Sequence, residues 1–136
     1  MSPTALLIDD HPIKLRRLAQ ALEQEGLGVI EQPPHHGHFT PATREMLDTV
    51  DAIAVDVCMP ERDGFEYLRH IQALGLDAAC ILYSQHDGGY LDFARMLNAQ
   101  AVCNLSREGE RALVERVRHH ATAWRRLKET PRGYGT

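Results

Sequence analysis

Short apolar runs of four to six residues alternate along the chain with longer segments in which apolar residues recur at helical spacing. Such runs, bounded by turn residues, are typical of buried strands, and the segments between them are typical of amphipathic helices. The expected strands are residues 4–9, 28–31, 52–57, 79–84 and 101–105. The pattern predicts five strand–helix units in succession.

Proline, glycine and small polar residues indicate where the helices begin and end. The expected helices begin at Pro12, after the cap residue Thr40, at Phe65, at Tyr90 and after the cap residue Ser106. They end near Gly26, Thr49, Gly75, Asn98 and Lys128. The last helix is therefore the longest.

The strands are almost continuously apolar, which is typical of a parallel sheet covered by helices on both faces. We therefore expect a doubly wound α/β fold. Ligands of such folds bind beyond the carboxyl ends of the strands. The polar residues at those ends are Asp9, Asp10, Asp56 and Ser84.

The 136 residues fit one domain of ordinary composition, with 43% hydrophobic and 25% charged residues. The odd number of cysteines, three, indicates reduced buried thiols and not a disulfide framework. No segment resembles a membrane span or a signal peptide, so we expect a cytoplasmic protein with no membrane contact.

Charge is unevenly distributed. Residues 1–106 carry seven Lys and Arg against fifteen Asp and Glu, whereas residues 107–136 carry eight against four. An acidic body disfavours direct binding of nucleic acid. The basic last segment is most simply a solvated helix face, and contact with an acidic partner is the alternative.

Three carboxylates at one edge of a sheet repel each other unless a carboxyl group stays protonated or a divalent cation binds. Oxygen ligands at a wet pocket suit Mg²⁺, which completes its coordination with water or phosphoryl oxygens. A carboxylate such as that of Asp56 can attack phosphorus and form an acyl phosphate. The Ser84 hydroxyl could then hydrogen-bond the phosphoryl oxygens.

At these positions the chain resembles the receiver domain of two-component response regulators. The matching segments are residues 8–12, 55–60 with 63–64, and 82–84, and the likeness covers about residues 4–120. It implies a flavodoxin-like (βα)5 three-layer sandwich with strand order 2-1-3-4-5. Residues 1–122 would form the receiver domain, and residues 123–136 an extension of the last helix with a linker-like tail.

The resemblance also implies roles for individual residues. Asp56 would be the phosphoacceptor, and Asp9, Asp10, Asp56 and the backbone carbonyl of Cys58 would hold Mg²⁺. Ser84 would be the hydroxyl that couples phosphorylation to a protein-interaction surface. The donor would be a phosphohistidine on a histidine kinase or phosphotransfer protein. Such a domain supports only its own phosphotransfer and autodephosphorylation, so it is not an enzyme acting on a separate substrate.

The lysine that receivers carry at the end of the fifth strand is missing. The two lysines of the chain, Lys14 and Lys128, cannot occupy that position, and Arg107 is the nearest substitute. Arginine keeps the charge but is bulkier than an ammonium group. Glu108 beside it adds negative charge.

Further departures affect access and switching. Gln85 stands where a small residue usually leaves access to the acceptor, and His86 lies near the pocket. Asn104 stands at the aromatic switch position. These departures leave open a second interpretation, a pseudo-receiver that works as an interaction or dimerisation module without phosphate. A phosphoryl-transfer enzyme is disfavoured because Cys58 stands where a general acid would be needed.

Two features outside the acidic pocket have open interpretations. Trp124 lies beyond the length that covers the sheet, so it either contacts a second copy or an output domain, or packs back on its own domain. His35, His36 and His38 form a cluster in a Pro/Gly-rich loop, where exposed histidines are more common than a metal site.

Overall fold

Five parallel strands form one sheet in the order β2-β1-β3-β4-β5. The computed structural model describes residues 2–32, 47–57, 64–75, 77–86 and 99–130. The strands are β1 (Thr4–Ile8), β2 (Gly28–Gln32), β3 (Ala52–Asp56), β4 (Ala79–Ser84) and β5 (Ala101–Asn104). This order confirms the predicted doubly wound sheet, whose order reverses between β1 and β3.

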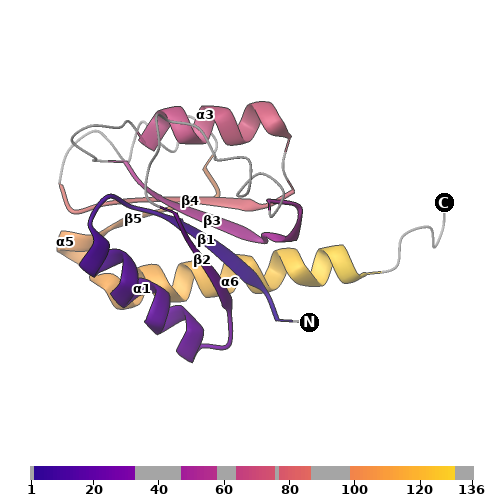
Figure 1. The fold of residues 1–136 in the computed structure, drawn as a ribbon, viewed down its shortest axis with the longest axis horizontal. Helices are drawn as coiled ribbons and strands as arrows, with labels where there is room; N and C mark the ends of the chain where they lie inside the picture. The colour runs from indigo at the N-terminus through magenta and orange to yellow at the C-terminus, as the bar shows by residue number, and fades with distance from the viewer. Residues whose placement is uncertain (1, 33–46, 58–63, 76, 87–98, 131–136) are drawn as a thin grey trace.

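Helices cover both faces of the sheet, so the predicted three-layer sandwich is confirmed (Figure 1). α3 (Gly64–Leu74) lies on one face, and α1 (Pro12–Gln24) and α6 (Glu110–Glu129) lie on the other. Two short helices, η1 (Leu47–Thr49) and α5 (Leu105–Glu108), precede β3 and follow β5. The helices expected over residues 40–49 and 90–98 lie outside the described residues, except for η1.

Strand residues alternate between two apolar cores because successive side chains point to opposite faces of a sheet. In β1, Leu6 and Ile8 face the core under α3, whereas Ala5 and Leu7 face the core under α1 and α6. All four are at most 1% exposed. This burial on both faces explains why the strands read as continuous apolar runs.

Glycine ends two of the helices, as predicted. Gly26 follows α1 with φ 91°, and Gly75 follows α3 with φ 64°. This left-handed backbone region is open to glycine at little cost because glycine lacks Cβ. The sequence pattern therefore placed these two helix ends correctly.

The last predicted helix is wrong at its start, because the chain forms two helices there. Asn104, and not Ser106, is the cap: its side chain accepts a hydrogen bond from Arg107 N, and α5 begins at Leu105. Gly109, with φ 83°, then separates α5 from α6. Asparagine caps helices as well as serine does, so Ser106 had a competitor two residues earlier.

The segment beyond residue 122 continues α6 to Glu129 without a break. Trp124 is partly buried and packs against the core between the sheet, α1 and α6. This is the second of its two expected arrangements. Residues 131–136, expected to be linker-like, lie outside the described part of the chain.

Two of the three cysteines are described, and both are free and buried. Burial raises the pKa of the Cys80 thiol to about 12, and burial is also the main cause that raises the pKa of Cys103 to about 11. They are therefore inert thiols, as expected for packing residues. In the described residues, no helix combines the length and the apolarity of a membrane span.

Candidate functional site

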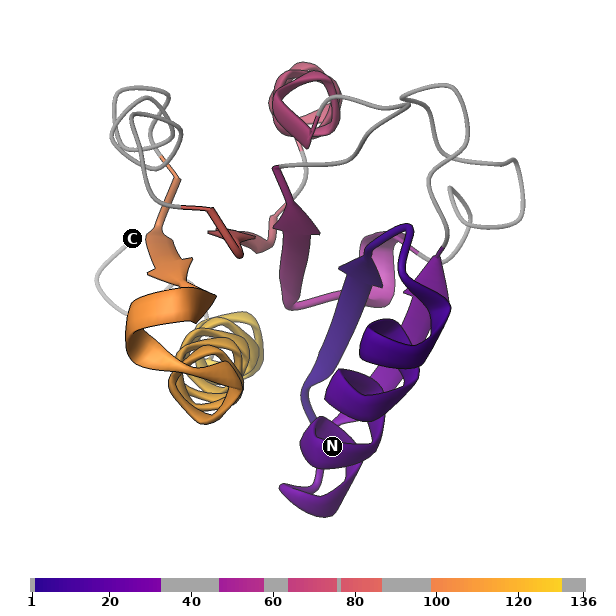
Figure 2. The same cartoon turned by 90° about the vertical axis from the view of Figure 1, so that its left-hand side faces the viewer.

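The predicted acidic residues gather at the carboxyl edge of the sheet. This edge is at the left of Figure 1 and faces the viewer in Figure 2, where α1 and α5 begin. Asp9 follows β1 directly, Asp56 ends β3 and Ser84 ends β4. Parallel neighbours that end together bring these polar residues to the point where the strand order reverses.

The Asp9 carboxylate is fully buried and is held from three sides. Its Oδ1 accepts a hydrogen bond of 2.8 Å from His11 N, and its Oδ2 accepts one of 2.7 Å from the Tyr83 hydroxyl. Lys14 Nζ lies 3.1 Å from the same Oδ2. Burial, followed by the charge of Asp9, raises the pKa of Tyr83 well above its usual value, so the phenol stays a donor.

Asp9, Asp10, Asp56 and His11 form a compact group of possible metal ligands. One ligand atom from each lies within 4.8 Å of all the others. Asp10 Oδ1 is buried without a hydrogen-bond partner, although His11 Nδ1 is 2.9 Å away at a distance suited to an ion pair. A buried acceptor left without a donor is costly, and an added cation would satisfy it.

The three carboxylates fit Mg²⁺, which prefers oxygen ligands and retains several waters. The predicted fourth ligand, the backbone carbonyl of Cys58, lies outside the described residues. The described part of the site thus agrees with a hard divalent cation in its donor atoms and in its unsatisfied oxygen.

Lys14 is a site residue that the sequence did not reveal. Its side chain is 8% exposed, and Nζ lies 3.1 Å from Oδ2 of Asp9 and 3.1 Å from Oδ2 of Asp56. Nζ is also 5.6 Å from the centre of the Tyr83 ring. Burial alone would lower the pKa of Lys14, but the charges of Asp56 and Asp9 outweigh it and raise the pKa.

One signal in the sequence pointed to Lys14. It lies four residues before Leu18, whose side chain is buried, so both occupy the same face of α1. A lysine on the apolar face of a helix usually extends its charge toward solvent or an acid. Here that face adjoins the acidic strand ends.

An open cavity of about 370 Å³ gives access to Asp56 from solvent. Gln85 and His86, the two predicted access residues, are exposed and belong to its wall. Its lining residues are His11, Ile13, Lys14, Arg17, Asp56, Gln85 and His86. The cavity wall therefore carries groups of both charges, with the ammonium of Lys14 beside the carboxylate of Asp56.

The Ser84 side chain is fully buried beside this cavity and is not one of its lining residues. Its Oγ accepts a hydrogen bond of 3.0 Å from His86 N. The Ser106 hydroxyl donates to the backbone oxygen of Gln85, which connects α5 to the end of β4. The hydroxyls of Ser84 and Ser106 thus both hold the short segment that follows β4.

β5 ends one residue earlier than the sequence predicted. Asn104 pairs with Ser84 in the sheet and ends the strand, so Arg107 lies one turn into α5. Arg107 is exposed and is not a lining residue of the cavity. Its role as substitute for the missing lysine therefore stays a prediction.

Glu108, expected to add negative charge near the acceptor, is paired elsewhere. It accepts hydrogen bonds from Arg116 and from Asn104 N. The Arg116 guanidinium, together with that backbone donor, lowers the pKa of Glu108 to about 2. Its charge is therefore largely compensated within α5 and α6.

The family model for the response regulator receiver domain matches residues 5–118. The chain belongs to this family. A receiver domain is a module of two-component signalling, so this finding confirms the resemblance and the signalling class.

Relatives and solved structures agree with the family. BvgA of Bordetella pertussis, named as a positive transcription regulator of virulence factors, is 31% identical over 71 residues, or 52% of this chain and 33% of that protein. The match thus spans about a third of the relative's length. Among solved structures, a CheY-like response regulator receiver domain protein of Methanospirillum hungatei has a TM-score of 0.71 at 18% identity, covering 93% and 99% of the two chains.

A second solved structure is similar over most of both chains. The response regulator protein TrrA of Thermotoga maritima, in complex with Mg²⁺ and beryllofluoride, has a TM-score of 0.67 at 23% identity, covering 88% and 98%. At these identities the structures establish the fold alone.

Proposed function

We propose that this receiver domain accepts a phosphoryl group on Asp56 with the help of Mg²⁺. The observation that supports it is the excess of negative charge at the carboxyl edge. Asp9 and Asp56 are buried and share the ammonium of Lys14, and Asp10 adds a third carboxylate with an unsatisfied buried oxygen. Such an edge favours added positive charge and presents a carboxylate to an open cavity.

Each residue of the acidic cluster would have its own role in the phosphoryl transfer. Asp9, Asp10 and Asp56, with the Cys58 carbonyl, would hold Mg²⁺, which when bound offsets the charge of the incoming phosphoryl oxygens. A carboxylate oxygen of Asp56 attacks phosphorus, and the N–P bond of a phosphohistidine breaks. The bonding electron pair stays on the imidazole, which leaves as a neutral ring carrying a proton on its other nitrogen. Asp56 becomes an acyl phosphate.

The neighbouring groups would control access and readout. Gln85 and His86 line the approach to Asp56, and Ser84 lies at the end of the adjacent strand. We expect the Ser84 hydroxyl to turn toward the phosphoryl oxygens and thereby release His86 N. That exchange would change the surface formed by β5 and α5 for a partner protein.

The expected donors are a histidine kinase or a phosphotransfer protein in the cytoplasm. We expect an output domain to respond to the signal. The curated relatives are about three times longer than the matched segment and are named as transcription regulators. The receiver itself is proposed to act through protein contacts.

Labelling with acetyl phosphate and Mg²⁺ tests this function. Intact-mass measurement should show addition of one phosphoryl group in the wild type and none in Asp56→Asn. The acyl phosphate should be lost on treatment with hydroxylamine, which distinguishes it from a phosphoserine. Equal labelling of the wild type and Asp56→Asn, or no labelling of either, would contradict the proposal.

A further inference from the structure

Lys14 is the charged residue of α1 that points into the sheet edge instead of solvent. Its ammonium bridges Oδ2 of Asp9 and Oδ2 of Asp56 at 3.1 Å each. The residue is 7% exposed, yet it also lines the cavity through which Asp56 is reached. It therefore touches the acceptor carboxylate and the space that a phosphoryl group would occupy.

The other basic residue on the cavity wall is committed to a different partner. Arg17 donates to Glu110 of α6 through Nε at 2.7 Å and through a second guanidinium nitrogen. This bidentate pair ties α1 to α6. Of the Lys and Arg side chains lining this cavity, Lys14 is the one with a contact to Asp56.

Phosphorylation of Asp56 would change what Lys14 faces. The single negative charge of the carboxylate would be replaced by a phosphoryl group that carries more charge and three oxygens. An ammonium group is a compact donor of three hydrogen bonds, so it can keep Asp9 while turning to a phosphoryl oxygen.

We propose that Lys14 of α1 supplies the positive charge that pairs with the phosphoryl group on Asp56, in place of a lysine at the end of β5. This inference rests on the proposed function. Lys14 keeps its proton throughout: the P–O bond to Asp56 forms and the donor's N–P bond breaks, while the ammonium follows the growing negative charge. The cation that pairs with the phosphoryl group would thus come from the first turn of α1 and not from the end of β5.

The proposal predicts opposite changes in two affinities when Lys14 is replaced by Met. Beryllofluoride, which mimics a phosphoryl group, should bind roughly ten- to hundredfold more weakly at saturating Mg²⁺, because a charge-assisted hydrogen bond is lost. Mg²⁺ alone should bind several-fold more tightly, because the carboxylates lose a competing positive charge. Calorimetric titration of the full 136-residue chain with each probe measures both effects.

Matched variants separate charge from packing. Lys14→Arg keeps the positive charge and should bind beryllofluoride more tightly than Lys14→Met. Arg107→Met removes the sequence-predicted substitute and should bind it as the wild type does. Urea unfolding of each variant checks that the domain is folded.

Each remaining outcome has a defined meaning. Unchanged beryllofluoride binding by Lys14→Met, with binding by the wild type, would overturn the role of Lys14 and leave the proposed function standing. Weaker binding of both probes would make Lys14 a structural residue, and loss confined to Arg107→Met would assign the role to Arg107. Failure of the wild type to bind beryllofluoride with Mg²⁺ would overturn both proposals.

Discussion

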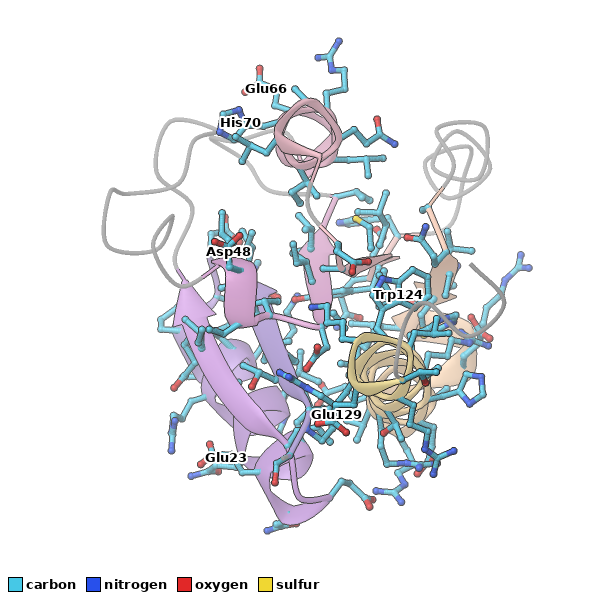
Figure 3. All side chains as sticks on the ribbon, turned by 90° about the vertical axis from the view of Figure 1, so that its right-hand side faces the viewer. Glu23, Asp48, Glu66, His70, Trp124 and Glu129 are labelled. Atoms are coloured by element: carbon cyan, nitrogen blue, oxygen red, sulfur yellow. The ribbon has the colours of Figure 1, made fainter. Side chains whose placement is uncertain are left out.

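Asp51 at the amino end of the sheet is buried, as are Asp9 and Asp56 at the carboxyl end, but the two ends are neutralised differently. Asp51 has two positive partners from α6: Arg125 Nε lies 3.1 Å from its Oδ2, and Lys128 Nζ lies 3.1 Å from its Oδ1. Thr4 N donates a further hydrogen bond of 2.8 Å. Figure 3 views the domain from this side, with Trp124 and Glu129 marking the end of α6.

The carboxyl end has the reverse balance: Asp9 and Asp56 share the ammonium of Lys14, and Asp10 adds a third carboxylate to the same group. A buried charge without a partner is costly, so the amino end is complete as it stands, whereas the carboxyl end is stabilised by an added cation. Buried acid alone therefore does not mark a functional site. The net charge left after pairing distinguishes the two ends. Asp51 is paired with two cations and has a structural role, whereas the carboxyl end keeps an excess of negative charge that a cation could bind.

Removal of the end of α6 should have the largest effect. A chain ending at Thr122 loses both cations of Asp51 and the packing of Trp124, so it should be destabilised by roughly 5 kcal/mol. Urea denaturation followed by circular dichroism measures this. A chain ending at Thr130 retains all of α6 and is the control. If both truncated chains unfold at the same urea concentration, residues 123–129 do not contribute to the stability of the domain.

Asp-to-Asn substitutions at the two ends of the sheet should change the free energy of unfolding by different amounts. Asp51→Asn leaves Arg125 and Lys128 without their counter-ion and should cost about 3 kcal/mol. Asp56→Asn relieves repulsion while Lys14 keeps Asp9, so its free energy of unfolding should change by less than about 1 kcal/mol. Equal losses in urea denaturation would mean that the charge balance does not distinguish the two ends.

Mg²⁺ should stabilise the protein through the carboxyl end alone. At ten times its dissociation constant, a ligand that binds only the folded state adds about 1.4 kcal/mol. Thermal unfolding with Mg²⁺, compared with EDTA, should show this gain in the wild type and in Lys128→Met. The gain should disappear in the Asp10→Asn, Asp56→Asn double variant. Its persistence there would place the metal elsewhere.

The smallest effect concerns Glu108, an exposed carboxylate outside both clusters. Because Arg116 and Asn104 N lower its pKa to about 2 in the folded state, its contribution is present above its unfolded pKa of about 4.5. The contribution is lost as the pH falls from there toward 2. Glu108→Gln should therefore make stability less dependent on pH across this window, measured as urea midpoints at each pH. A steeper dependence in the variant would contradict this sign.

The fold was largely predictable because its signals are local. Runs such as residues 52–57 are apolar on both faces, which only a sheet covered on both sides requires. Gly26 and Gly75 marked helix ends by their freedom to adopt positive φ. The start of α5 at Leu105 was missed because Asn104 and Ser106 are both good caps, and local propensity does not choose between them.

The site was predictable in part. Asp9, Asp10 and Asp56 follow strands that end together, so the sheet alone brings them to one edge. The role of Arg107 as substitute for the missing lysine stays a prediction, and the structure places this residue in α5. Lys14 was overlooked because its contact with Asp56 spans 42 residues.

The parallel sheet, the acidic edge and the likeness to receivers could be predicted from the amino-acid sequence, because periodicity and strand-end residues are encoded over short stretches. Which positive charge contacts which acid could not be predicted without the folded structure. Lys14 reaches Asp56 because α1 packs on β1, the neighbour of β3 in the sheet, and Arg125 and Lys128 reach Asp51 because α6 crosses the same face. Charge pairing depends on distances of a few ångströms between segments far apart in the chain, and such distances arise only when the helices dock on the sheet.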